Sequence, residues 1–545
     1  MKFSISIVII FLHFFFVVAQ QTTPRDSLLA GTHFEHTCYD VTHYDLSIKL
    51  DIEKRTISGS NNISYCVVTN NNRIQLDLSH HLQIDSILFE GKHCTFSRLY
   101  DSFFINLPRE TTVGEQLNTT VFYHGDMLVA KNPPWDGGFV FSKDSLGNPF
   151  IGVACQEIGA SKWWPTKELL SDKCDSADMH FEIPAKLKAI SNGQFIHREE
   201  KGATAIYHWK VTYPINNYNI SVTIGYFAHF TDEYRFKKTA YPLDYYVLPE
   251  NLAKAKKQFK QVKPMLKAYE QLFGPYPFAR DGYKLVEAPY AGMEHQSAVA
   301  YGNKYENGYL GSYFSAVSKK FDFIIIHESG HEYWGNNICM SDRSDMWIHE
   351  GFDTYSELLY IEKVFGKKYV DDYVAYWRTK MINDEALVNR RYSNEIPTSD
   401  IYYKGALLLH TIRYLVNDDA LFLGCLKAIQ CEFALKTVDT PTLIHFMNNY
   451  LKRDYTAIFN QYLYSTFPPM LNFTLKPSKT LKGYDFTYKW DGVEEGFVLP
   501  VTAIFNKKKI TVEVTNKLQT LYIPMKSITI YDFDMSKAYF LVKYE

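Results

Sequence analysis

One pattern of five residues constrains this chain more than any other feature, because residues 327–331 read H-E-x-x-H. On a helix, positions i and i+4 lie on one face, so His327 and His331 can reach one metal ion while Glu328 borders the same site. A catalytic zinc ion usually has three protein ligands and a water. Glu350, which follows His331 after eighteen intervening residues, is the predicted third ligand. The sequence therefore predicts two helices that meet at a metal site.

Chance accounts poorly for this pattern. With 18 histidines among 545 residues, H-E-x-x-H is expected in about 3% of such chains, and a glutamate at one fixed later spacing reduces this to about 0.2%. The apolar run 323–326 would bury the helix on most sides, which is where a preorganised site belongs. Because a glycine inside a helix costs about 1 kcal/mol, we expect a neighbouring segment to approach closely at Gly330.

The spacing of apolar residues changes twice along the chain. From about residue 39 to 230, polar and apolar residues alternate in short runs that end in turn residues, which indicates an antiparallel β domain. From about 249 to 467 the spacing becomes three and four, which indicates helices. After Pro469 short alternating strands return. Helices are predicted at 250–273, 317–334, 347–364, 404–416 and 420–435, and late strands at 484–490, 510–514 and 538–542.

These patterns predict a multidomain α+β protein. At about 150 residues per domain, the chain has room for three or four domains. We expect a signal peptide at 1–20, an N-terminal antiparallel β domain at 21–230, a mostly helical catalytic domain at 231–468 and a small C-terminal β-sandwich-like module at 469–545.

The first residues predict the compartment. Lys2 precedes an apolar run from Phe3 to Ala19, and polar Gln20 and Gln21 follow, which is the order of a secretory signal. The alternative is a retained membrane anchor, but the run is slightly shorter than the ~20 residues of a spanning helix. We therefore favour a secreted or periplasmic protein with no membrane span after signal removal over one anchored by an uncleaved N-terminus.

Charge and cysteine content exclude some classes. The 58 basic and 60 acidic residues give no surplus of positive charge for a nucleic-acid partner. Eight cysteines are too few for a disulfide scaffold. Cys155 and Cys174 are the best candidates for a bridge, whereas Cys425 and Cys431 are expected to be two buried thiols.

Beyond the zinc motif, three further segments carry a resemblance to a known family. They are Gly292-Met293-Glu294-His295, Tyr402-Tyr403-Lys404-Gly405, and Gln156 before Trp163-Trp164-Pro165. With the two predicted metal-binding helices, they resemble the aminopeptidase N family of zinc metallopeptidases, within the gluzincins, over about residues 39–471. The resemblance implies a thermolysin-like catalytic domain and one zinc ion per chain.

The resemblance also implies catalytic roles. His327, His331 and Glu350 would hold zinc, which polarises the scissile carbonyl and lowers the pKa of a water. Glu328 would act as the general base and then as the general acid. The hydroxyl of Tyr402 would donate to the oxyanion. Its neighbour Tyr403 is the alternative, and Glu357 is a candidate acceptor for a zinc-binding imidazole.

Substrate binding is implied in the same way. Glu294 would accept the free α-ammonium of a peptide, and Gln156 would share it. Gly292, Met293 and His295 belong to the same substrate-binding segment, with Met293 beside the first side-chain pocket. The expected substrates are therefore peptides with a free N-terminus.

Two departures from the family bear on activity. His295 stands where the family has an asparagine that contacts the substrate backbone, and a charged imidazole there would compete with the ammonium, which predicts an alkaline optimum. The chain also resembles a short form without the large helical C-terminal domain, so a more open cleft is expected. A zinc endopeptidase on the same scaffold and a catalytically silent binding protein that keeps the fold remain alternatives, and the oligomeric state is not predicted.

Overall fold

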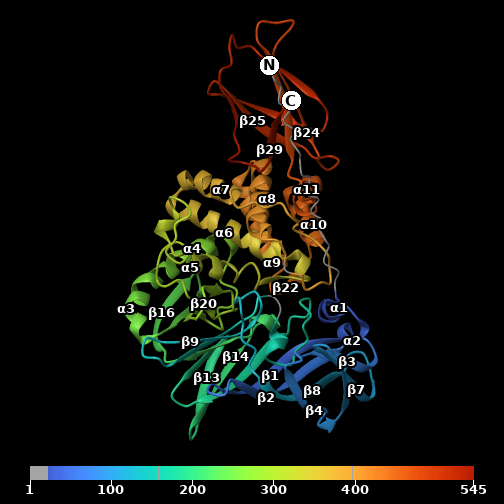
Figure 1. The fold of residues 1–545 in the computed structure, drawn as a ribbon, viewed down its shortest axis with the longest axis vertical. Coiled ribbons are helices and arrows are strands. Elements are labelled where there is room, and N and C mark those ends of the chain that lie inside the picture. The colour runs from blue at the N-terminus through green and yellow to red at the C-terminus, as the bar shows by residue number, and fades with distance from the viewer. Residues whose placement is uncertain (1–22, 157–158, 396) are drawn as a thin grey trace, which may run out of the picture.

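A computed structural model of the protein describes residues 23–156, 159–395 and 397–545. The predicted signal peptide at 1–20 lies outside these residues. Along the long axis of the molecule, a β-rich N-terminal part is followed by a helical middle part and then by a β-rich C-terminal part (Figure 1). Within the described ranges, no helix has both the length and the apolar character needed to cross a bilayer.

The N-terminal part is built on an eight-stranded sheet in the order β13-β14-β11-β1-β2-β8-β4-β5. Alternate residues of β1, including Leu46, Ile48 and Leu50, are buried, as the period-two pattern predicts. The pairing of β1 with β11 is parallel, so this sheet is not purely antiparallel. A four-stranded sheet (β12-β15-β10-β9) and a three-stranded sheet (β3-β7-β6) complete this part.

The elements of the N-terminal part have the following bounds: α1 Pro24–Ala30, α2 Phe34–Thr37, β1 Tyr39–Asp51, β2 Thr56–Val67, β3 Asn71–Asp77, β4 Leu82–Phe89, β5 Lys92–His93, β6 Thr95–Leu99, β7 Ser102–Thr111, β8 Gln116–Asp126, β9 Gly138–Lys143, β10 Pro149–Ala154, β11 Ser176–Pro184, β12 Lys188–Ser191, β13 Gln194–Lys201, β14 Thr204–Val211 and β15 Val222–Gly225.

The middle part begins with a mixed five-stranded sheet in the order β16-β17-β18-β20-β19. Because β16 starts at Ala228, the predicted domain boundary at residue 230 falls inside a strand. The bounds are β16 Ala228–Phe236, β17 Thr239–Val247, β18 Tyr283–Glu287, β19 Gly292–Met293, β20 Val299–Tyr301, α3 Leu252–Gln258, α4 Val262–Phe273, α5 Phe323–Gly330, β21 Ile338–Met340, α6 Trp347–Phe365, α7 Val370–Arg378, α8 Asp400–Val416, α9 Asp419–Glu432, β22 Lys436–Val438, α10 Thr440–Leu451 and α11 Thr456–Leu463.

Most predicted helices are present, but the ends and number differ. The helix predicted at 317–334 is α5 alone, because the Asp322 side chain accepts from Ile325 N and caps the helix there. The helix predicted at 250–273 is divided into α3 and α4 by a short 3₁₀ segment. Helices α7, α10 and α11 were not predicted. The apolar spacing therefore identifies the long helices better than their ends.

Helices α6 and α8 cross at two glycines. A Cβ atom on Gly351 would lie 3.0 Å from the Cα atom of Gly405, so the two backbones are in direct contact there. Glu350 precedes one glycine and Tyr402 lies three residues before the other. This crossing therefore fixes the metal-ligand helix against the helix that carries the candidate catalytic tyrosine.

The C-terminal part packs two sheets together, β27-β24-β23-β29 and β26-β25-β28. Phe473, Phe486 and Phe505 are among the buried side chains between them. The predicted fold class, with an N-terminal β domain, a helical catalytic domain and a C-terminal β module, is confirmed. The strands are β23 Met470–Pro477, β24 Tyr484–Asp491, β25 Leu499–Phe505, β26 Lys508–Val514, β27 Gln519–Ile523, β28 Tyr531–Phe533 and β29 Leu541–Tyr544.

The cysteine predictions need correction. All eight cysteines lie among the described residues and all are free thiols. The predicted Cys155–Cys174 bridge is wrong, because the Cys155 thiol donates to Gly159 O and the Cys174 thiol donates to Ile215 O. Cys425 is buried as expected, but Cys431 is exposed.

Candidate active site

A cavity of about 770 Å³ lies where the N-terminal part meets the helical part. Residues 133–135 and Gln156 reach it from the N-terminal part, and α5, α6, α7 and α8 supply about half of the remaining wall. Every predicted site residue except His295 lines this cavity. Among them are Gly292 and Met293, which form the short strand β19.

The three predicted metal ligands lie together. His327 is in the last turn of α5, His331 follows that helix, and Glu350 is in the first turn of α6. Glu350 Oε2 lies 3.7 Å from His327 Nε2 and 3.4 Å from His331 Nε2. No donor in the described part of the chain forms a hydrogen bond to this buried oxygen. Two imidazole nitrogens and one carboxylate oxygen without a donor suit a zinc ion.

The second nitrogen of each imidazole has a different partner. His331 Nδ1 is 2.9 Å from the Trp334 carbonyl oxygen, whereas His327 Nδ1 is 2.7 Å from Glu357 Oε1. These contacts leave both Nε2 atoms facing the metal position. Burial alone would lower the pKa of His327, but the carboxylates of Asp353 and Glu357 raise it well above its ordinary value.

The other oxygen of Glu350 is held by two donors. Tyr402 Oη and Gln156 Nε2 each donate to Glu350 Oε1 over 3.0 Å. Burial opposes ionisation of Glu350, but the His331 and His327 imidazoles and the Tyr402 hydroxyl lower its pKa. Tyr403 instead packs its ring against Tyr376, 6.0 Å away between ring centroids. The geometry therefore favours Tyr402 over Tyr403 as the hydroxyl beside the metal.

Glu328 points into the cavity beside the metal position and is 7% exposed. Its burial raises the pKa of the carboxyl to about 8, against the lowering effect of the two imidazoles. A Cβ atom on Gly292 would lie 2.5 Å from Glu328 Oε1, so a side chain there would displace the carboxylate from its present position. A carboxylate with a pKa close to neutrality can both accept and return a proton.

Glu294 is a second buried carboxylate on the His331 side of the site, and it is 2% exposed. Its ligating oxygen lies within 4.8 Å of those of Glu328 and His331. Tyr218 Oη donates to Glu294 Oε1 over 3.4 Å, and Asn336 Nδ2 donates to the Glu294 carbonyl oxygen over 2.8 Å. Burial raises the pKa of this carboxyl.

His295 departs from the expectation for it. The ring is 1% exposed and lies outside the set of described residues that line the cavity. Burial lowers the pKa of His295 to about 3, so the imidazole is neutral at any ordinary assay pH. The reason given for an alkaline optimum, a charged His295 beside the substrate ammonium, is therefore wrong.

The sequence reasoning did not identify several residues at this site. Arg343 and Lys380 line the cavity, and Trp135 reaches it from the N-terminal part. Asp353 lies behind His327. The spacing of Asp353, three residues after Glu350 on the same helix, was the available signal, whereas nothing in the sequence marks the other three.

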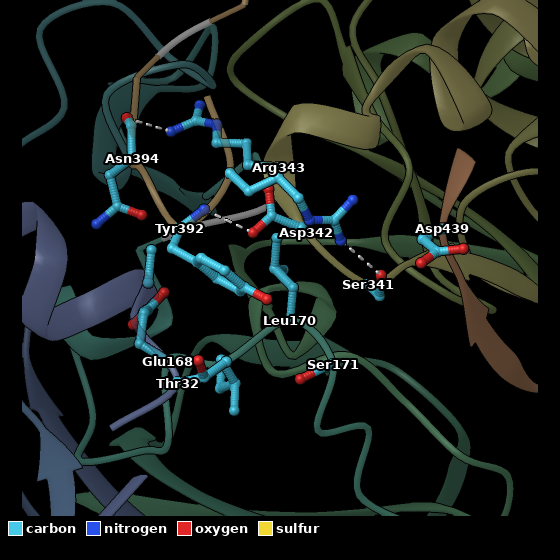
Figure 2. A pocket seen from close by; sticks show the side chains of 13 residues that line it. Thr32, Glu168, Leu170, Ser171, Ser341, Asp342, Arg343, Tyr392, Asn394 and Asp439 are labelled. Atoms are coloured by element: carbon cyan, nitrogen blue, oxygen red, sulfur yellow. Dashed lines mark hydrogen bonds between the residues drawn. The ribbon is translucent and has the colours of Figure 1, made fainter. Parts of the chain in front are cut away.

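A smaller cavity of about 260 Å³ lies beside the N-terminal part and shares Arg343 with the first (Figure 2). Several of its polar groups have partners in the cavity wall or next to it. Arg343 Nη1 donates to Asn394 O over 2.9 Å, Tyr392 N donates to Asp342 Oδ2 over 2.8 Å, and Arg391 pairs with Asp345 at 3.0 Å. These contacts explain the loop structure without a ligand.

Comparison with known proteins gives consistent matches. Residues 257–462 match the peptidase family M1 domain, and residues 41–218 match the peptidase M1 N-terminal domain. Leukotriene A-4 hydrolase from Xenopus laevis is 21% identical over 440 residues, covering 76% of this chain and 69% of that protein. Leucyl aminopeptidase from Saccharolobus solfataricus is 22% identical over 342 residues, covering 60% of this chain and 42% of that protein.

Solved structures give the same fold. The crystal structure of an M1 zinc metallopeptidase from Deinococcus radiodurans has a TM-score of 0.65 at 20% identity, covering 79% of this chain and 94% of that chain.

Proposed function

This chain belongs to peptidase family M1, and from that premise we propose that it is a zinc aminopeptidase, which removes the first residue of peptides with a free N-terminus. The observation that carries the proposal is the position of Glu294. Its buried carboxylate lies beside Glu328 and His331 and faces the same cavity as the metal ligands. A carboxylate there suits the α-ammonium of a peptide, because a buried charge needs a charged partner.

His327, His331 and Glu350 would hold one zinc ion. When bound, zinc polarises a carbonyl group and lowers the pKa of a water molecule. The second partners of both imidazoles and the two donors on Glu350 hold the ligands in place before metal binds.

Glu328 would take a proton from the attacking water as its oxygen adds to the scissile carbonyl carbon. It would return that proton to the amide nitrogen as the C–N bond breaks, so the products are an amino acid and a shortened peptide with a new free amine. The Tyr402 hydroxyl would turn from Glu350 to the developing oxyanion, where a donor lowers the barrier more than it stabilises the substrate.

Residues 1–20 support a further proposal, that the protein is exported. Their order of one basic residue, an apolar run and small residues before Gln20 is that of a cleaved signal. The size of the mature secreted chain would test this part separately from the activity.

The test of activity uses purified protein with its metal content measured. A panel of amino-acid amides and short peptides is assayed with and without a zinc chelator, and each peptide is paired with its N-acetylated copy. We expect stepwise release of N-terminal residues that the chelator stops. Because a charge-assisted hydrogen bond contributes about 1.5–3 kcal/mol, acetylation should lower kcat/KM by about 10–100-fold.

Each alternative has its own outcome. Equal cleavage of the acetylated copies at internal bonds would identify an endopeptidase. Binding of zinc and peptide without any cleavage would identify a silent binding protein. Either result would overturn the proposal.

A further inference from the structure

Asp353 is a buried carboxylate with an unusual position. It lies one turn after Glu350 on α6, is 0% exposed, and places Oδ2 2.9 Å from His327 Nδ1 and 3.8 Å from His331 Nε2. Asp353 thus contacts the nitrogen of His327 that faces away from the metal position, and it lies close to the nitrogen of His331 that faces this position. Nothing in the H-E-x-x-H pattern or the distant glutamate requires a carboxylate here.

The oxygens of Asp353 have few partners. Oδ1 has no hydrogen-bonding partner in the described ranges, and Oδ2 has only the 2.9 Å contact with His327 Nδ1, whose better-aligned acceptor is Glu357. Glu357, by contrast, accepts from both His327 Nδ1 and Tyr373 Oη. A fully buried carboxylate with so few partners is costly unless a positive charge lies beside it, since it has lost its hydration.

The adjacent helix accommodates Asp353 specifically. Gly330 lies between His327 and His331, and a Cβ atom there would overlap Asp353 Oδ1. The close approach expected at Gly330 is therefore made by this carboxylate. A residue with low helix propensity therefore stands in the metal-binding helix, where it leaves space for the Asp353 carboxylate beside His327.

A divalent cation bound at this site would compensate the negative charge of Asp353. Two neutral imidazoles and the single charge of Glu350 leave one positive charge of a zinc ion uncompensated among the ligands. We propose that Asp353 is a positioning residue of the zinc site, which holds the back of His327 with Glu357 and supplies the negative charge that the bound ion compensates. The inference rests on zinc binding by His327, His331 and Glu350, and not on the identity of the substrate.

This role predicts that Asp353→Asn lowers two measured quantities. The amide has nearly the same shape and no charge, so it no longer pairs with the His327 imidazole, and the metal-free variant should unfold at a lower temperature than the metal-free wild type. Zinc affinity, measured by competition with a chromophoric chelator at pH 8, should fall by about 10–100-fold. The increase in Tm on adding zinc should shrink accordingly.

Asp345→Asn is the matched control. Asp345 is also buried, but it pairs with Arg391 at 3.0 Å and accepts from Thr440 N at 3.2 Å. This variant should lower the Tm of the metal-free protein and leave zinc affinity unchanged.

The outcomes separate the proposals. Unchanged zinc affinity in Asp353→Asn, with or without a loss of Tm, would show a structural role only and overturn the inference. Two zinc equivalents in the wild type and one in the variant would also overturn it, because His327, Asp353 and Glu357 would then hold their own ion. A wild type that binds no zinc would instead defeat the proposed enzymatic function.

Discussion

Two regions of this protein bury carboxylates in contrasting ways. In the N-terminal part, Asp77 Oδ1 accepts from Gln75 and Ser102, and Oδ2 accepts from Glu168 N. Both oxygens of Glu168 accept from backbone amides, those of Gly159 and Ser161. In the catalytic domain, Glu350 Oε2 and Asp353 Oδ1 have no such donors among the described residues, and Asp353 Oδ2 has only the His327 Nδ1 atom 2.9 Å away.

This difference between the two sets of buried carboxylates separates structural groups from candidate functional groups. Four carboxylate oxygens that each have a donor contribute to the stability of the fold, because the hydrogen bonds replace those to water. At the metal site the carboxylate oxygens instead face imidazoles whose pKa is raised well above its ordinary value, so this place favours positive charge, which a bound cation would supply. Predictions that exchange a carboxylate for an amide in each region therefore test the comparison directly.

The largest effect is expected from Glu328→Gln. The amide keeps the shape of the side chain but cannot take a proton from water, so turnover of a free-amine peptide should fall by about 10³-fold. Zinc content, measured on the same sample, should stay at the wild-type level. Residual activity close to wild type would assign the base to another group.

The second largest loss of turnover is expected from Tyr402→Phe. Loss of one hydroxyl that donates to the oxyanion should lower kcat by about 100-fold and change KM little. Steady-state kinetics on the preferred amide measures both. Tyr403→Phe is the control, and a larger loss there would reverse the choice between the two tyrosines.

Gly330→Ala tests the contact that Asp353 makes. The added methyl group has to displace the carboxylate or separate the helices, so the free energy of unfolding should fall by about 2 kcal/mol. In an Asp353→Ala background the same change should cost much less, because the overlap is gone. Denaturant unfolding of the four proteins gives the coupling, and equal costs in both backgrounds would contradict the contact.

Glu168→Gln is the counterpart in the N-terminal part. Loss of two charge-assisted hydrogen bonds should lower the free energy of unfolding by about 1–2 kcal/mol at neutral pH. Because burial raises the pKa of this carboxyl, the folded wild type binds the proton more readily than the unfolded chain, so the loss should be larger at acid pH. Zinc affinity and turnover per folded molecule should not change. A loss of zinc affinity, as expected for Asp353→Asn, would remove the distinction between the regions.

The smallest effect on activity is expected from His295→Asn. With a pKa of about 3 the buried ring is already neutral, so the pH dependence of kcat/KM between pH 5 and 9 should keep its shape. The folding free energy, in contrast, should depend on pH. The unfolded chain binds a proton near the ordinary pKa of 6.5 and the folded one does not, so folding free energy is lost as the pH falls from about 6.5 towards 3. The asparagine variant should lose less of it over this range.

The sequence predicts the architecture because the spacing of apolar residues differs clearly between long amphipathic helices and alternating strands. It predicts the three metal ligands because i and i+4 spacing fixes their common face. The Cys155–Cys174 bridge and a charged His295 were predicted wrongly, since both depend on burial and partners that arise only when distant segments pack. Asp353 was not predicted, although its spacing of three residues after Glu350 was an available signal, because its contact with Gly330 arises only when the two helices pack.

The hydrogen bond from Gln156 to Glu350 joins residues 194 positions apart. Its donor belongs to the N-terminal part of the chain and its acceptor to the metal-binding helix, so neither part alone contains the complete centre. A fragment cut between the two matched domains would contain every metal ligand but would lack Gln156, one of the groups that orient them. A chimaera with a relative would therefore have to exchange both segments together.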